Sequence, residues 1–293
     1  MDLKTYSEYL LQQIESLILS SKELVYRRNA LQQASNSESQ NNVSIRYYNL
    51  VHELKSLIFL SKYGKLTPSA DHAHEAGCDT IVNGHYQIEF VCTSRGKNRD
   101  QNGYAPIFAN TSSKVIIGDY SEKERFLYSR ITNVLEEKRK FYEDHSISGT
   151  ISTHKPYLIF VGLGELAYEM FCGDCGIEFT GVLLGKGCPY IAFNSNDLVV
   201  DRGYTHNDTF PKIIKNKTVD LDCNLFCKEE YRCMSGVIFT KAKLFEEYTT
   251  SNTWLFINPL ANVKIIKKDF PGLIYWSERN GVYQPRRNGK RIV

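Results

Sequence analysis

The sequence lacks any uninterrupted apolar run of the ~18 residues that a membrane-spanning helix needs. Its start, with Asp2 ahead of an amphipathic pattern, does not resemble a secretory signal peptide. It also lacks a strong charge of one sign, since 36 basic and 33 acidic residues leave a formal net charge of +3. That balance, with 42% hydrophobic residues, excludes a disordered acidic or basic chain. We therefore expect a soluble, cytoplasmic, globular protein with no membrane partner.

Two common catalytic signatures are missing as well. Gly162-Leu163-Gly164 has no further part of a phosphate-binding loop around it, and no GxSxG nucleophile motif occurs. The chain therefore carries no local signature of a P-loop enzyme or of a serine hydrolase.

Cysteines are too sparse for a disulfide framework, because there are only eight among 293 residues. A structural Zn²⁺ site is an alternative to reduced thiols, and two groups of residues could supply its ligands. One group consists of the CxxC pair Cys172 and Cys175 together with Cys223, Cys227 and Cys233. The other consists of His72, His74 and Cys78 with His52 or His85. The first group departs from the usual paired CxxC spacing and the second lies in or beside a polar loop, so we favour free thiols and solvated histidines.

The pattern of apolar residues divides the chain into helical and strand-rich parts. Apolar residues at helical spacing predict helices over 6–33, about 47–58 and about 121–143. A polar run from Gln33 to Asn42 reads as a linker. Short strands are predicted after residue 155, at 157–161, 181–184, 190–193, 236–240 and 254–257. The order of elements predicts an α/β or α+β domain with a mixed central sheet flanked by helices and a strand-rich C-terminal elaboration.

Two β-rich runs meet at Asn83-Gly84, which is a strong signal for a β-hairpin. Asp79 begins the first run and Glu89 lies in the middle of the second, while Glu53 borders the apolar stripe of the preceding helix. A two-residue loop would place Asp79 and Glu89 on opposite faces of the hairpin, whereas a three-residue loop would place them on the same face. A shared acidic site therefore requires the three-residue loop. The alternative is that the three acids are ordinary surface or helix-edge carboxylates.

This order of residues resembles the core of the PD-(D/E)xK nuclease superfamily. The resemblance rests on a helix with an inward-edge Glu, then an Asp, then a hydrophobic-Glu-hydrophobic strand, and then a helix with basic residues. It implies a restriction-endonuclease-like core in which Asp79 and Glu89, helped by Glu53, hold Mg²⁺ or Mn²⁺. The metal would activate the attacking water and offset the charge that develops on the phosphate.

The sequence departs from the family pattern at the lysine. That residue normally follows the second carboxylate by two positions, where this chain has Val91, and Cys78 replaces the usual Pro before the Asp. Lys138 falls inside the apolar stripe of the third helix, so it is the first candidate for the missing cation, and Lys97 is the second. Migration of the lysine to this helix is known among diverged members of the family.

A narrower resemblance supports the fold. The helix pattern Arg130-x-Thr132-Asn133 with Lys138, the strand after Lys155-Pro156-Tyr157, and Asn258-Pro259-x-Ala261 are similar to a group of bacterial nuclease-like proteins. The similarity spans about residues 45–275.

Basic residues near the predicted site are candidates for contacts with nucleic acid. Arg95, Lys97 and Arg99 follow the hairpin, and Arg130 lies on the third helix. The stretch after residue 278 holds five basic residues and no acidic one, and a solvated basic tail is the alternative to a phosphate-binding one.

These observations predict a helical arm over 1–42, a PD-(D/E)xK-like domain over 43–278 and a basic tail over 279–293. They predict metal-dependent hydrolysis of phosphodiester bonds in DNA, with Asp79, Glu89 and Glu53 on the metal and Lys138 as the catalytic cation. A catalytically inactive relative that binds nucleic acid or a protein partner is one alternative, and a zinc-stabilised interaction protein is another. The sequence leaves homo-oligomer formation open.

Overall fold

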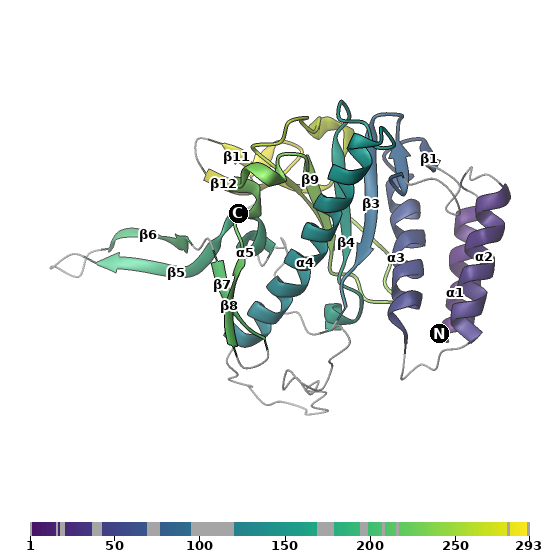
Figure 1. The fold of residues 1–293 in the computed structure, drawn as a ribbon, viewed down its shortest axis with the longest axis horizontal. Coiled ribbons are helices and arrows are strands. Elements are labelled where there is room, and N and C mark those ends of the chain that lie inside the picture. Colours follow the sequence, from purple (N-terminus) through teal and green to yellow (C-terminus); the bar gives the residue numbers. More distant parts are fainter. Residues whose placement is uncertain are drawn as a thin grey trace.

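A computed structural model describes most of the chain and shows a mixed sheet between helices (Figure 1). The described residues are 2–15, 17, 21–36, 43–68, 77–94, 120–168, 179–193, 199–206, 209–214, 217–279 and 282–291.

Three helices form the layer on one side of the sheet. These are α1 (Leu3–Glu15), α2 (Ser21–Asn36) and α3 (Ile45–Leu60). The expectation of a single helix over 6–33 was wrong, because two helices occupy this stretch. Ser21, the first residue of α2, fits this break, since serine favours helix ends. The polar run predicted as a linker overlaps the end of α2.

The central sheet has nine strands in the order β1-β2-β3-β4-β9-β10-β11-β12-β13. Its strands are β1 (Leu66–Pro68), β2 (Thr80–Val82), β3 (Tyr86–Cys92), β4 (Tyr157–Gly162), β9 (Gly236–Thr240), β10 (Thr253–Ile257), β11 (Ile274–Arg279), β12 (Val282–Arg287) and β13 (Lys290–Arg291). The middle strands β3, β4 and β9 are mutually parallel, and the hairpins β2–β3 and β11–β12 are antiparallel. The sheet is therefore mixed, as the sequence predicts.

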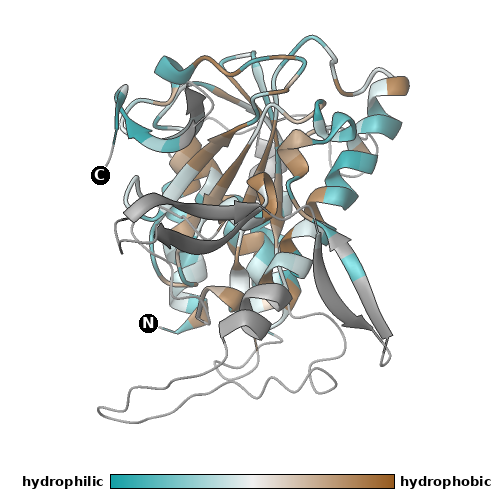
Figure 2. Ribbon diagram, turned by 90° about the vertical axis from the view of Figure 1, so that its left-hand side faces the viewer, coloured by the Kyte–Doolittle hydropathy of each residue, from teal (hydrophilic) through white to brown (hydrophobic). Residues whose placement is uncertain are grey.

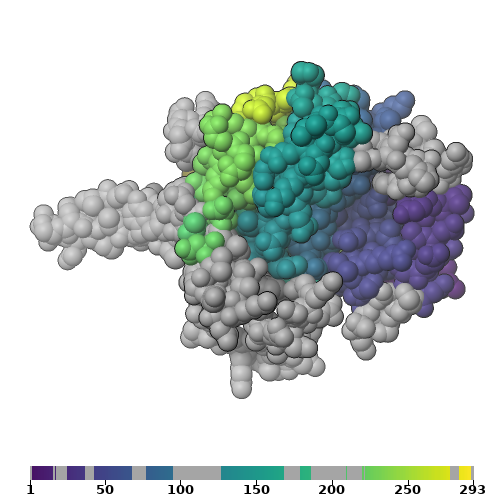
Figure 3. Space-filling model, in the orientation of Figure 1, coloured from purple at the N-terminus to yellow at the C-terminus, as the bar shows by residue number. Residues whose placement is uncertain are grey.

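Side chains of the middle strands alternate between two cores. Ile88, Phe90 and Phe160 pack against α3 on one face. Ile159 and Val161 pack on the other face with residues of α4 (Tyr120–Ile147) and α5 (Phe179–Leu184). All six residues of β4 are buried, as expected for a parallel strand covered on both faces. Figure 2 shows these strands as an apolar centre, and Figure 3 shows α4 covering the outside of its face. We call the two sides the α3 face and the α4 face.

The C-terminal half is strand-rich, as predicted, but only part of it joins the central sheet. β5 (Lys186–Phe193) pairs with β6 (Val199–His206), and β7 (Thr209–Ile214) pairs with β8 (Lys217–Asp222), in two separate hairpins. The predicted strand at 181–184 was wrong, because these residues belong to the short helix α5. Buried apolar residues at successive positions fit either structure in so short a run. The predicted strands at 157–161, 236–240 and 254–257 are confirmed.

Short 3₁₀ helices complete the described elements. They are η1 (Gly164–Tyr168), η2 (Leu225–Cys227), η3 (Glu229–Tyr231) and η4 (Lys267–Asp269). The stretch predicted as a basic tail lies mainly in β12 and β13, which form one edge of the sheet. Among the helices in the described ranges, none is both long enough and apolar enough to cross a bilayer.

The α3 face contains a buried polar cluster. The ring of His52 bonds the Tyr248 hydroxyl through Nδ1 at 2.6 Å and the Phe160 carbonyl through Nε2 at 2.9 Å. Lys55 Nζ donates to the carbonyls of Lys243 and Leu244 at 2.9 and 3.2 Å and lies 4.4 Å from the centre of the Tyr248 ring. Burial lowers the pKa of His52 to about 4 and that of Lys55 to about 7. These hydrogen bonds fasten α3 to β4 and to the segment between β9 and β10.

Candidate functional site

The β2–β3 hairpin has a loop of odd length. Val82 pairs with Tyr86, so Asn83, Gly84 and His85 form the loop. Asn83 and Gly84 have positive φ angles of 54° and 67°, which asparagine and glycine tolerate better than other residues. The sequence analysis named a three-residue loop as the condition for a shared acidic site.

The hairpin loop is tied to the end of α3. Asn83 Nδ2 donates to the Tyr63 carbonyl at 3.1 Å, and Asn83 Oδ1 accepts from the Lys65 amide at 2.9 Å. A Cβ on Gly64 would lie 2.0 Å from Asn83 Oδ1, so only glycine leaves room for this side chain. The contacts hold the loop in one position relative to the helix.

The register places two carboxylates opposite each other. Thr80 pairs with Ile88, and one further step along the same register brings Asp79 opposite Glu89. Residues directly opposite in an antiparallel pair point to the same face with Cβ atoms roughly 5 Å apart. Asp79 Oδ2 also accepts from the Phe90 amide at 2.6 Å, which fixes the half-buried Asp79 against β3. Both acids therefore belong to the α4 face.

Lys138 of α4 reaches this pair of acids. Its Nζ lies 2.5 Å from Glu89 Oε2, and Glu89 is only 2% exposed. The other oxygen, Glu89 Oε1, is buried and has no hydrogen-bond partner among the described residues. The lysine points inward because Val134, Leu135 and Tyr142 on the same stripe of α4 are buried against the sheet.

The electrostatics of the site favour an additional positive charge. Burial, reinforced by the Asp79 carboxylate, raises the pKa of Glu89 to about 8, although the Lys138 ammonium opposes this shift. Burial acts to lower the pKa of Lys138, but Glu89 and Asp79 outweigh it and leave that pKa raised. The lysine therefore stays cationic beside both carboxylates. A further cation beside Glu89 would lower the pKa of that carboxyl group.

The structure does not bring Glu53 into this site. Glu53 forms an ion pair with Arg27 of α2, whose side chain is 1% exposed. α3 packs on the opposite face of the sheet from Lys138, so Glu53 and Glu89 are separated by the sheet itself. The sequence predicts that Glu53 borders the apolar stripe of its helix. In the structure this stripe packs against α2 and against the sheet on the side opposite Glu89. Glu53 thus joins two helices, and its predicted metal-binding role has no support in this geometry.

The basic candidates are only partly described. The Arg130 guanidinium donates from Nε to the Ser94 carbonyl at 2.5 Å and from Nη2 to the Ser94 hydroxyl at 3.3 Å. It therefore anchors the backbone just after β3. Arg95, Lys97 and Arg99 lie outside the described residues, so the second lysine candidate is not placed. Val91, at the family's usual lysine position, packs against the core of the α4 face.

The zinc candidates do not form a group where they are described. Within the described ranges, no three His, Cys, Asp or Glu side chains gather closely enough to hold a metal. Cys223 is buried, Cys227 is exposed and Cys233 is half-buried. His72, His74 and the CxxC pair lie outside the described residues.

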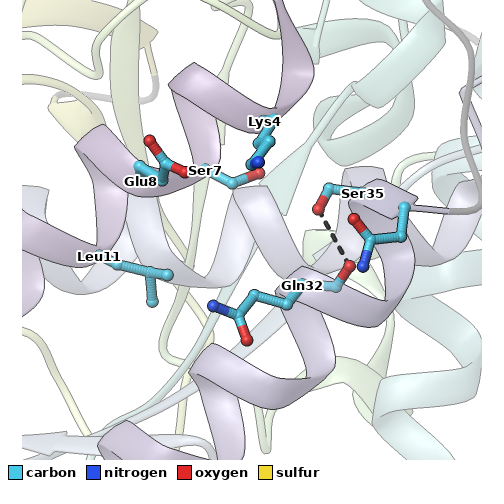
Figure 4. Close-up of a pocket in the computed structure, with 7 residues that line it drawn as sticks. Lys4, Ser7, Glu8, Leu11, Gln32 and Ser35 are labelled. Atoms are coloured by element: carbon cyan, nitrogen blue, oxygen red, sulfur yellow. Dashed lines mark hydrogen bonds between the residues drawn. The ribbon is translucent and has the colours of Figure 1, made fainter.

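A groove of about 200 Å³ lies between α1 and α2, away from these acids (Figure 4). Lys4, Ser7 and Glu8 of α1 line it opposite Gln32 and Ser35 of α2. The sequence analysis did not anticipate this groove, and it contains none of the predicted site residues. The sequence analysis also did not predict that Lys55 is buried. Its position next to Leu54, on the apolar stripe of the helix, was the only indication of burial.

Comparison of the chain with protein-family models, with curated proteins and with solved structures finds no match.

Proposed function

We propose that the protein is a metal-dependent phosphodiester hydrolase that acts on DNA through a restriction-endonuclease-like core. The observation that carries this proposal is the ion pair between Lys138 and Glu89, with Asp79 opposite Glu89 on the same face. Two acids and a lysine are the residue types that the resemblance requires. Here the lysine comes from α4, and the strand position two residues after Glu89 holds Val91.

The two carboxylates fit a small divalent cation. Mg²⁺ commonly binds through one or two carboxylates and keeps several water molecules, so a third protein ligand is not needed. Glu89 Oε1 is a buried oxygen without a partner among the described residues, and an oxygen of this kind is a natural ligand for Mg²⁺ or Mn²⁺. The raised pKa of Glu89 further supports a cation at this position. When bound, the metal would activate water and offset negative charge on the phosphate.

Other groups of the chain orient the two acids and supply a positive charge for the phosphate. The Phe90 amide and the Lys138 ammonium orient Asp79 and Glu89, respectively, so that the acids are held before a ligand arrives. The Lys138 side chain is 21% exposed, so this cation lies at the border between the buried Glu89 and solvent. A preorganised cation in a partly desolvated site stabilises developing negative charge more strongly than it would in water.

The test is cleavage of supercoiled plasmid with Mg²⁺ or Mn²⁺. We expect the purified chain to nick DNA, and we expect Asp79→Asn, Glu89→Gln and Lys138→Met each to lower the rate at least about 100-fold, the usual cost of removing a group that stabilises a transition state. Lys140→Met is the matched control, because Lys140 lies two residues away on α4 with a side chain 65% exposed. That variant should retain the wild-type rate.

Three results would refute the proposal. Cleavage that survives both acidic substitutions would locate the activity elsewhere or in a contaminant. A loss of rate in Lys140→Met equal to that in Lys138→Met would show that the lysine acts only through general charge. A wild-type chain that cleaves neither DNA nor RNA with either metal would show that the protein is not a phosphodiester hydrolase under these conditions.

A second candidate is an inactive relative that binds nucleic acid without cutting it. It is favoured by Val91 at the usual lysine position and by the placement of Glu53 on the opposite face, which leaves two acids where the resemblance implies three. Binding of a labelled duplex without cleavage in either metal would support this candidate over the hydrolase.

A further inference from the structure

The hairpin of β12 and β13 places like charges opposite one another. Arg286 pairs with Arg291, and Arg287 pairs with Lys290 across the turn. Asn288 and Gly289 form the turn with positive φ angles of 50° and 80°, the conformation of a two-residue hairpin loop. Directly opposed like charges destabilise an antiparallel pair. The tight turn therefore fixes four cations in an arrangement that costs stability in the free protein.

A fifth cation joins this hairpin from η4. Lys267 Nζ lies 5.4 Å from the centre of the Tyr275 ring, and Tyr275 of β11 pairs with Arg286. Residues paired in this way share a face, so Lys267, Arg286 and Arg291 lie together on the α3 face of the sheet edge. Burial and the nearby Arg286 guanidinium lower the pKa of Lys267, which agrees with their proximity.

No acidic residue offsets these charges in the described part of the chain. The ion pairs formed among described residues include none of the five cations. Arg286 Nη1 donates to the Gly289 carbonyl at 3.1 Å, and Arg287 Nη2 donates to the Thr250 carbonyl at 3.4 Å. These bonds orient the guanidinium groups and leave their remaining donors for a ligand. Arg287, Lys290 and Arg291 are exposed.

We propose that these five cations, with Lys267, Arg286 and Arg291 on the α3 face and Arg287 and Lys290 on the other face at the tip of the same hairpin, form a basic cluster that binds the phosphate backbone of nucleic acid. Guanidinium groups match phosphate oxygens with paired donors, and the Cα atoms of residues paired across the hairpin lie roughly 5 Å apart, so their long side chains can reach neighbouring phosphates of one backbone. The choice of nucleic acid as the polyanion rests on the proposed function. In the sheet order, β4, β9, β10 and β11 separate the four hairpin cations from Glu89, and Lys267 lies on the α3 face, opposite the α4 face of Glu89. Binding here is therefore separable from chemistry there.

The test measures binding without cleavage. A fluorescent 20-base-pair duplex is titrated with the full chain in EDTA at several salt concentrations, and its anisotropy is recorded. We expect Arg286→Gln/Arg291→Gln to lower the slope of log affinity against log salt by about 1.8, since each lost phosphate contact removes about 0.9. At 0.1 M salt this corresponds to an affinity about 60-fold weaker.

The matched control removes the same amount of charge from the helical layer. Lys4 of α1 and Arg46 of α3 are exposed, and Lys4→Gln/Arg46→Gln should change the affinity less than twofold. The Arg286→Gln/Arg291→Gln variant should unfold at the wild-type temperature or above, because the substitution relieves repulsion. Lys267→Gln/Lys290→Gln, which leaves both arginines in place, should reproduce the loss of affinity.

The outcomes separate this inference from the proposed function. If both cluster variants bind the duplex as tightly as the control, the inference is wrong even when the wild type cleaves DNA. If the wild type never cleaves but loses affinity in both cluster variants, the inference stands and the hydrolase proposal falls. Cluster-dependent binding to phosphatidylserine vesicles, with no binding to the duplex, would overturn the inference in favour of an anionic lipid surface.

Discussion

The buried Lys55 predicts that stability depends on pH in an unusual direction. Burial lowers the pKa of its amine from an ordinary 10.5 to about 7, because the ammonium loses water on the α3 face. The unfolded chain keeps the ordinary pKa, so between pH 7 and 10.5 it binds more protons than the folded chain does. The free energy of unfolding therefore rises with pH across this range. The destabilisation caused by burying the charged Lys55 amine is fully present below pH 7.

The magnitude follows from the two pKa values. At pH 6.5 about three-quarters of the folded lysine is protonated, and at pH 8.5 almost none is, while the unfolded lysine stays protonated throughout. With 1.36 kcal/mol for each pKa unit, the contribution to the free energy of unfolding grows by about 2 kcal/mol over this interval. Lys55→Met cannot titrate, so it should lack this contribution.

Urea unfolding of the wild type and of Lys55→Met at pH 6.5, 7.5 and 8.5 measures the difference. Other titrating groups are common to both proteins and cancel in the comparison. We expect the free energy of unfolding of the wild type to gain about 2 kcal/mol relative to the variant between pH 6.5 and 8.5. Parallel pH dependences would show that Lys55 is charged in the folded protein, and the reasoning about its burial would fail.

Two further predictions concern packing and the role of Glu53. Glu53→Gln removes the carboxylate that pairs with the buried Arg27 and should destabilise the protein by about 2–3 kcal/mol in urea unfolding, below the cost for a fully buried pair because the Glu53 side chain is 20% exposed. The same variant should keep its rate of plasmid cleavage per folded molecule, and a loss comparable to that of Glu89→Gln would return Glu53 to the active site. Gly162→Ala would place its Cβ 2.5 Å from Nδ1 of the buried His52, so we expect a loss of about 1–3 kcal/mol in thermal or urea unfolding. Shortening His52 to alanine in the same chain should remove most of the added penalty, and simple additivity of the two changes would contradict a steric cause.

Local patterns in the sequence were enough to predict much of the fold. The Asn-Gly signal located the β2–β3 hairpin, and the apolar stripe of α4 indicated that Lys138 points inward. The same turn signal occurs at Asn288-Gly289, but the residues around it are basic rather than apolar, so the apolar pattern does not reveal the strands β12 and β13. Charge on an edge strand is ordinary, since edges are exposed to water.

The long-range arrangement was less accessible from the sequence. The partner of Glu53 is Arg27, and nothing in the spacing of the two residues reveals that α2 packs beside α3. Helical periodicity shows that a residue borders a buried stripe, but it does not show which face of the sheet that stripe covers. For Asp79 and Glu89 the sequence left two registers open, and only the pairing of Val82 with Tyr86 decides between them.

The attachment of Asn83 to the end of α3 has a consequence for how this chain can change over evolutionary time. Surface hairpin loops usually tolerate insertions and deletions. Here the loss of one loop residue would rotate Asp79 to the α3 face, and the hydrogen bonds of Asn83 to Tyr63 and Lys65 would break with it. Variation in the length of this exposed loop should therefore disturb the pairing of Asp79 with Glu89 as much as substitution of either acid, although no residue of the loop belongs to that pair.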